Sequence, residues 1–181
     1  MSDKKPKYFC AFIDGDSVSG KAYENLIKYL CRKSDCMSFD VFADVEERAK
    51  AIEKGYDVNR SLNEEETKYL YAINKTKRYF LNHIIRKETG RYMTTYYVSL
   101  KHINAEKKLL NADSIQHWNY PDDVENLCFY KNGVCTFCSV THEDYFAFYT
   151  DDETEVEELE KMSCATIHKK ISPSDDILKK I

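Results

Sequence analysis

The sequence contains little glycine and proline, and it lacks a long hydrophobic run. Its 181 residues include 5 glycines and 3 prolines, so no Pro/Gly-rich stretch indicates a linker or a disordered tract. The apolar run nearest the amino terminus, YFCAFI at 8–13, is too short for a signal-peptide core or a membrane span. We therefore expect a soluble, cytoplasmic protein with no membrane partner.

The 7 cysteines are odd in number and do not show the spacing of a small disulfide scaffold. In a chain without a secretion signal, reduced thiols that serve mostly as small core residues are expected. With 43% hydrophobic residues, the chain is long enough to close one sizeable core. We expect a single compact domain, 1–181, with two tightly joined lobes, 1–111 and 112–181, as the alternative.

The total charge of −4 conceals an uneven distribution along the chain. Residues 68–108 hold 10 Lys/Arg and 2 Asp/Glu, a net charge of +8, while the segments before and after carry −3 and −9. Seven aromatic residues are interleaved with these basic ones. Because phosphates bind Lys/Arg and unpaired bases stack on aromatic rings, nucleic-acid binding by this segment, through Lys77 and Arg78, is one hypothesis. The negative total charge argues against it.

Hydrophobic periodicity predicts an α+β fold. We expect a mixed sheet with an N-terminal strand–helix–strand unit, a long central amphipathic helix, and a C-terminal hairpin-rich strand set with one helix. The unbroken apolar run at 8–13 predicts a strand at the centre of the sheet. The ranges predicted for the next elements are a helix at 21–33, a strand at 37–43 and a helix at 45–54.

The middle of the chain predicts a long helix. Ser61 and Glu64 have the spacing of a capping box, and apolar residues then hold one face until the helix ends near Gly90. Residues 91–111 fit both a strand and a helix, and we favour the helix.

The C-terminal third predicts strands separated by tight turns. Asn132-Gly133 lies between two apolar runs and supplies the positive φ angles of a two-residue hairpin turn. A strand at 145–149, a helix capped by Thr150 and Glu153 that ends near Met162, and a strand at 164–168 are expected to follow.

The stretch GDSVSGKA at 15–22 has the glycine and lysine spacing of a phosphate-binding loop. The hydroxyl that would hold Mg²⁺ is replaced by Ala22, and Asp14 and Asp16 would repel phosphates. We therefore expect a connector between strand and helix. A nucleotide site with Asp14, Asp16, Ser19 and Lys21 is the alternative.

The stretch FIDGDSVSGKAYENL resembles the opening of NYN/PIN-type ribonuclease domains over roughly the first twenty residues. The resemblance implies a Mg²⁺ or Mn²⁺ site built on Asp14 together with acids from later strand ends. The family's later acidic motif is not visible in this chain.

A zinc site is suggested by CTFC at 135–138 with Cys128 and His142. In an uninterrupted hairpin, however, Cys128 pairs with Phe137, which places Cys138 on the opposite face of the sheet. Without a bulge the three thiols cannot converge, so core cysteines and no metal are expected.

Taken together, these patterns favour a non-catalytic protein-interaction or regulatory module that needs no cofactor and binds another protein. A metal-dependent nuclease or nucleotide-binding domain centred on the IDGDSVSGK turn is the alternative, and nucleic-acid binding by residues 68–108 is the second alternative. The sequence leaves the oligomeric state open.

Overall fold

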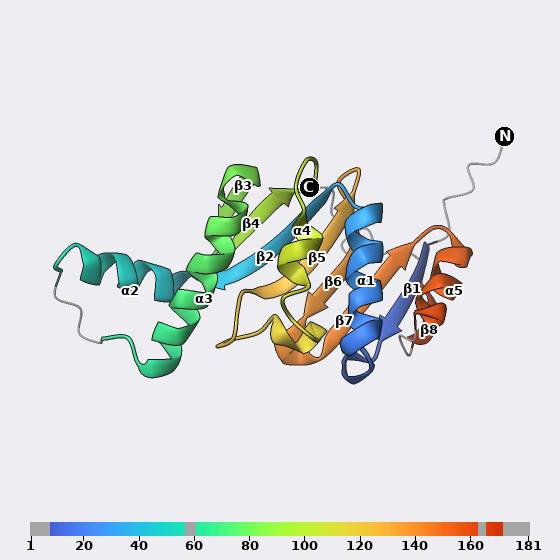
Figure 1. Ribbon diagram of the computed structural model, residues 1–181, viewed down its shortest axis with the longest axis horizontal. Coiled ribbons are helices and arrows are strands. Elements are labelled where there is room, and N and C mark those ends of the chain that lie inside the picture. The colour runs from blue at the N-terminus through green and yellow to red at the C-terminus, as the bar shows by residue number, and fades with distance from the viewer. Residues whose placement is uncertain (1–7, 57–60, 163–165, 172–181) are drawn as a thin grey trace.

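The computed structural model describes residues 8–56, 61–162 and 166–171, which form one sheet with helices on one of its faces (Figure 1). The sheet has eight strands in the order β3-β4-β2-β5-β6-β7-β1-β8. The expected α+β class is confirmed, but every strand pair is antiparallel and the sheet is not mixed. Within the described residues, no helix has the length and apolar character needed to cross a membrane.

Strands from both halves of the chain are hydrogen-bonded in this one sheet. Their bounds are β1 Tyr8–Ile13, β2 Cys36–Phe42, β3 Ile84–Thr89, β4 Met93–Ser99, β5 Glu125–Lys131, β6 Val134–Val140, β7 Tyr145–Thr150 and β8 Thr166–Ile171. Strand β1 pairs with β7 and β8, and β2 pairs with β4 and β5. The two predicted lobes therefore share a single sheet.

The helices lie on one face of the sheet, where α1, α3 and α4 cross in front of the strands (Figure 1). Each helix contributes at least one residue to the same buried cluster. Examples, in the order α1 to α5, are Leu26, Val45, Tyr69, Leu109 and Val156. The helix bounds are α1 Gly20–Lys33, α2 Ala43–Glu53, α3 Glu64–Phe80, α4 Ala105–Leu109 and α5 Glu153–Lys161.

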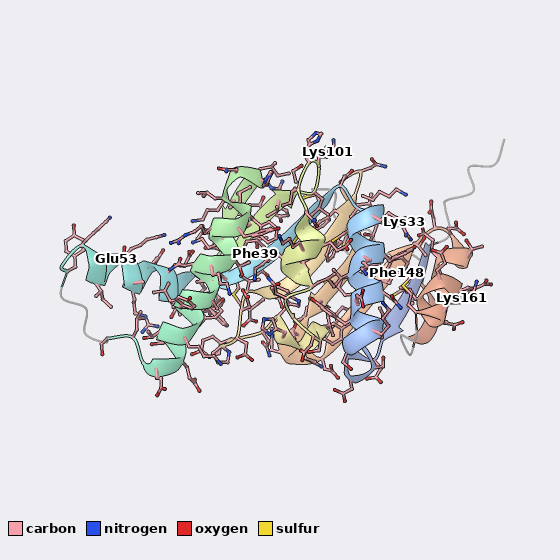
Figure 2. All side chains as sticks on the ribbon, in the orientation of Figure 1. Lys33, Phe39, Glu53, Lys101, Phe148 and Lys161 are labelled. Atoms are coloured by element: carbon pink, nitrogen blue, oxygen red, sulfur yellow. The ribbon has the colours of Figure 1, made fainter. Side chains whose placement is uncertain are left out.

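The core lies between the helices and this face of the sheet, where Phe39 and Phe148 are found (Figure 2). The ring of Phe39 packs against Phe80 of α3, and the ring of Phe148 packs against Tyr29 of α1. Burying such rings removes 150–250 Å² each from water and dominates the stability of the layer. Within the described part of the chain, the helices therefore pack against one face of the sheet only.

Strand β1 is not at the centre of the sheet, contrary to the prediction from its apolar run. It lies between β7 and β8, one strand from the edge. Ala11 and Ile13 belong to the core under the helices, whereas Cys10 belongs to a second, smaller apolar cluster. The run is unbroken because both faces of β1 carry apolar clusters.

The long central helix ends earlier than the sequence predicts. Helix α3 ends at Phe80, and β3 follows at Ile84. The capping box is formed by Asn63 and Glu66 rather than by Ser61 and Glu64. Apolar residues after Phe80 continue the helical spacing, but they pair instead with β4, because tertiary pairing overrides a local pattern.

The helix favoured for 91–111 is wrong over most of its length. Residues Met93–Ser99 form β4, in which Thr94, Tyr96 and Val98 are buried in alternation. This period of two is the strand signal. Only Ala105–Leu109 is helical.

The C-terminal third contains the predicted hairpin. Asn132 and Gly133, with φ angles of 52° and 78°, connect β5 to β6. Helix α5 begins after Asp152, whose side chain accepts from the Thr154 amide, and not at the predicted Thr150 cap. Strand β8 covers part of the predicted strand 164–168, whose first two residues lie outside the described ones.

Candidate functional site

The turn after β1 is a 3₁₀ turn, Gly15–Ser17, whose amide groups bond within the protein. The Asp16 amide donates to Asp14 Oδ1 at 3.3 Å, and the Val18 amide donates to the Gly15 carbonyl at 3.0 Å. The Gly20 amide donates to the Asp113 carbonyl at 2.7 Å. A phosphate loop needs such amides to point at its anion, so this geometry favours a connector.

The polar side chains of the turn do not converge on one point. Asp14 caps the turn, Lys21 pairs with Glu24 at 2.8 Å, and Asp16 and Ser19 are exposed. Ser19 occupies the N-cap position of α1 without making a side-chain cap hydrogen bond. In the three described ranges, no group of three or more His, Cys, Asp or Glu side chains is arranged to hold a metal ion.

The basic segment 68–108 is divided among α3, β3, β4 and α4, and several of its charges are paired inside the protein. Lys77 forms an ion pair with the buried Glu46. Lys108 lies 3.2 Å from the buried Asp123. Arg78, the other predicted contact to nucleic acid, is exposed on α3. These pairs reduce the charge available for phosphates.

Two carboxylates, the buried Glu125 and the partly buried Asp40, lie opposite each other where β2 and β5 meet. Asp40 pairs with Glu125 in the strand register, and burial raises the pKa of both side chains. Thr95 and Asn126 donate hydrogen bonds to Asp40, which partly oppose that rise. Sequence reasoning missed this pair because only the strand register brings these carboxylates together.

Glu125 is the more deeply buried of the two carboxylates, with its side chain 1% exposed. One oxygen, Oε1, accepts from the Tyr120 amide at 2.8 Å. The other oxygen, Oε2, has no hydrogen-bond partner in the described structure and lies 3.6 Å from Nδ1 of His142. His142, which the sequence suggested as a zinc ligand, thus lies beside the Glu125 carboxylate.

The sheet face opposite the helices, called the open face, is lined by aromatic and sulfur-containing side chains. No helix of the described chain contributes to the apolar cluster on it. Tyr97 and Tyr130 place their rings 6.1 Å apart, and the hydroxyl groups of Tyr145 and Tyr149 are 2.8 Å apart. The members of the cluster are Cys10, Phe12, Tyr130, Cys135, Cys138, Tyr145, Ala147 and Tyr149.

Hydroxyl groups on the open face form hydrogen bonds with one another. The Tyr130 hydroxyl lies 3.1 Å from Ser38 Oγ. Burial raises the pKa of Tyr130 and Tyr149, so both hydroxyl groups are neutral at physiological pH. The open face thus presents neutral rings and hydroxyl groups.

Comparison with known proteins gives no match to a family model, to a curated protein or to a solved structure. Arguments about function therefore rest on the geometry of the chain itself.

Proposed function

We propose that the protein is a non-catalytic protein-interaction module whose binding surface is the open face, and that a second copy of the chain occupies it. The observation that carries the proposal is the line of half-buried tyrosines on a sheet face that the described helices leave uncovered. A sheet in a soluble protein is stable when its apolar face packs on another layer. A second sheet provides such a layer at a spacing of about 10 Å.

The chemistry of the open face supports a protein partner rather than nucleic acid. Interface cores are rich in tyrosine and phenylalanine and poor in charge, as this face is. Its described charged side chains are the partly buried Asp40 and, on the edge strand β3, Arg86 and Glu88, which pair at 3.3 Å. Arg86 also lies over the ring of Tyr97 at 4.1 Å. Among the described side chains of this face, a phosphate backbone would find no line of lysines and arginines.

The low charge of the open face also supports a second copy of the chain as its partner. In a two-fold symmetric pair the same patch meets itself, so a face of one charge sign would repel its copy, and the described side chains of this face carry no such excess. Eight strands spaced by about 4.8 Å, each roughly 20 Å long, offer roughly 700 Å² per copy. A standard stable interface buries about 800 Å² per partner, so the available area is of the required size.

Sedimentation velocity over a concentration series tests the proposal. We expect the wild-type chain to show a reversible monomer–dimer equilibrium, with a Kd on the order of micromolar or tighter. Tyr97→Arg and Tyr145→Arg place a charge on the open face and should weaken the dimer at least about tenfold, because each buries an unpaired charge in the pair.

Tyr71→Arg is the matched control, because Tyr71 is 75% exposed on α3 and lies outside the open face. This variant should sediment as the wild type does. Circular dichroism of each variant confirms that its sheet is intact. A wild-type chain that is monomeric at every concentration, or a dimer that only Tyr71→Arg weakens, would refute the proposal.

A further inference from the structure

Three cysteines lie together on the open face, contrary to the sequence analysis. The hairpin of β5 and β6 carries a register shift between Phe129 and Tyr130. Because of this bulge, Cys128 pairs with Cys138 and not with Phe137, as the uninterrupted hairpin predicted. A bulge places two residues of one strand opposite one residue of the other and so changes which side chains share a face.

The bulge leaves Cys128 between two other thiols. Cys138 is directly opposite Cys128, and Cys135 is opposite Tyr130, two residues further along β5. The three thiols do not converge on a common point, in agreement with the lack of a metal-binding group among the described residues. They form instead a row in which Cys128 can reach either neighbour.

The spacing of the opposite pair suits a disulfide. Residues directly opposite on antiparallel strands have Cα atoms about 4.5–5.5 Å apart, and disulfides join Cα atoms about 4.4–6.8 Å apart. The strand register therefore gives Cys128 and Cys138 a Cα separation in the range that a disulfide joins. Both side chains are also partly exposed, whereas Cys10, Cys36 and Cys135 are buried.

We infer that Cys128 and Cys138 form a thiol pair on the open face that a low-molecular-weight disulfide oxidises to a cross-strand disulfide, with Cys135 as a second thiol within reach of Cys128. This is a modification site beyond the proposed interaction function, and it does not depend on dimer formation.

The chemistry proceeds by two exchange steps. The Cys128 thiolate attacks one sulfur of the small disulfide, forms a mixed disulfide and releases one small thiolate. The Cys138 thiolate, formed by loss of its proton to water, then attacks the Cys128 sulfur and releases the second small thiolate. The protein dithiol loses two electrons and two protons, and the small disulfide gains them as two thiols.

The surroundings of Cys128 favour it as the attacking group. Hydrogen bonds from the Cys135 and Cys138 thiols lower the pKa of Cys128 well below its usual range, with a further bond from the Ser139 amide. The same contacts, together with burial, raise the pKa of Cys135 and Cys138. A thiolate is the reactive form of cysteine, and Cys128 also lies between the other two thiols along the hairpin, so we expect Cys128 to react first.

Cys31 of α1 provides an internal control on the same chain. It is partly exposed like Cys128 and Cys138, but it packs against the core under the helices, away from the open face, and burial raises its pKa to about 12. It should therefore react more slowly than Cys128 with the same reagent.

The test incubates the folded, reduced chain with glutathione disulfide at a low protein concentration, then alkylates the remaining thiols in acid and maps peptides by mass spectrometry. We expect an intramolecular link between Cys128 and Cys138, with Cys31 still open to alkylation. In Cys138→Ser the link should be lost, and Cys128 should carry glutathione or join Cys135.

Cys135→Ser should leave the link between Cys128 and Cys138 intact. The inference is overturned if Cys128 and Cys138 both remain open to alkylation, if Cys31 reacts as fast as Cys128, or if Cys138→Ser does not change the product. Because the wild-type chain is measured directly, instability of a variant does not affect this result. A chain that sediments only as a monomer would refute the dimer proposal and leave this inference standing.

Discussion

Replacing Gly15 by alanine tests whether the turn after β1 is a packed connector. A Cβ atom added there would lie 2.3 Å from the Phe146 ring, 2.7 Å from Asp144 Oδ1 and 2.8 Å from Gln116 Nε2. Asp144 and Gln116 lie near the surface, but Phe146 is 1% exposed and must move within the core. Overpacking of this kind costs about 1–3 kcal/mol.

For a chain of 181 residues, each kcal/mol shifts the melting temperature by about 2–4 °C, so Gly15→Ala should lower it by about 2–12 °C. Urea unfolding gives the same loss as a lower midpoint with an unchanged slope. Gly90→Ala is the matched control, because its nearest contact, the Met93 carbonyl oxygen at 3.4 Å, is of ordinary length. If Gly15→Ala and Gly90→Ala had the same stability, the conclusion that the turn at Gly15 is tightly packed would be wrong.

Two further substitutions examine buried charges by urea unfolding. Burial raises the pKa of Glu125 above its unfolded value near 4.5. The stability that protonated Glu125 contributes is therefore complete below that unfolded pKa and is lost as pH rises through the higher folded pKa. Glu125→Gln should therefore stabilise the fold by about 1 kcal/mol at neutral pH and flatten the pH profile; a loss of stability at pH 7 would contradict this. Lys108→Met leaves Asp123 without the ammonium 3.2 Å away and should cost about 3 kcal/mol, whereas a cost below about 0.5 kcal/mol would show that the pair behaves as an exposed one.

The elements that the sequence predicts well have signals that are local. The hairpin at Asn132-Gly133 follows from two residues that accept positive φ angles. Helix α1 follows from apolar residues at helical spacing, and it begins within one residue of the predicted start. Such signals need no knowledge of distant neighbours.

The elements that the sequence does not predict depend on distant pairing. Residues Ile84–Thr89 continue the helical pattern of α3, and only pairing with β4 makes them a strand. The bulge near Tyr130 cannot be seen in a pattern of alternating residues, yet it decides that Cys128, Cys135 and Cys138 share a face. The open face is for this reason a property of the register and not of any motif.

Hydroxyl-radical footprinting at low and high protein concentration tests most directly whether the open face is where two copies meet. The oxidation of Tyr97, Tyr130 and Tyr145 should fall as the chain is concentrated, because the second copy excludes water from their rings. Tyr71, which is 75% exposed on the helix side, should be oxidised equally at both concentrations. Unchanged oxidation of the three open-face tyrosines, or protection of Tyr71 alone, would contradict the account.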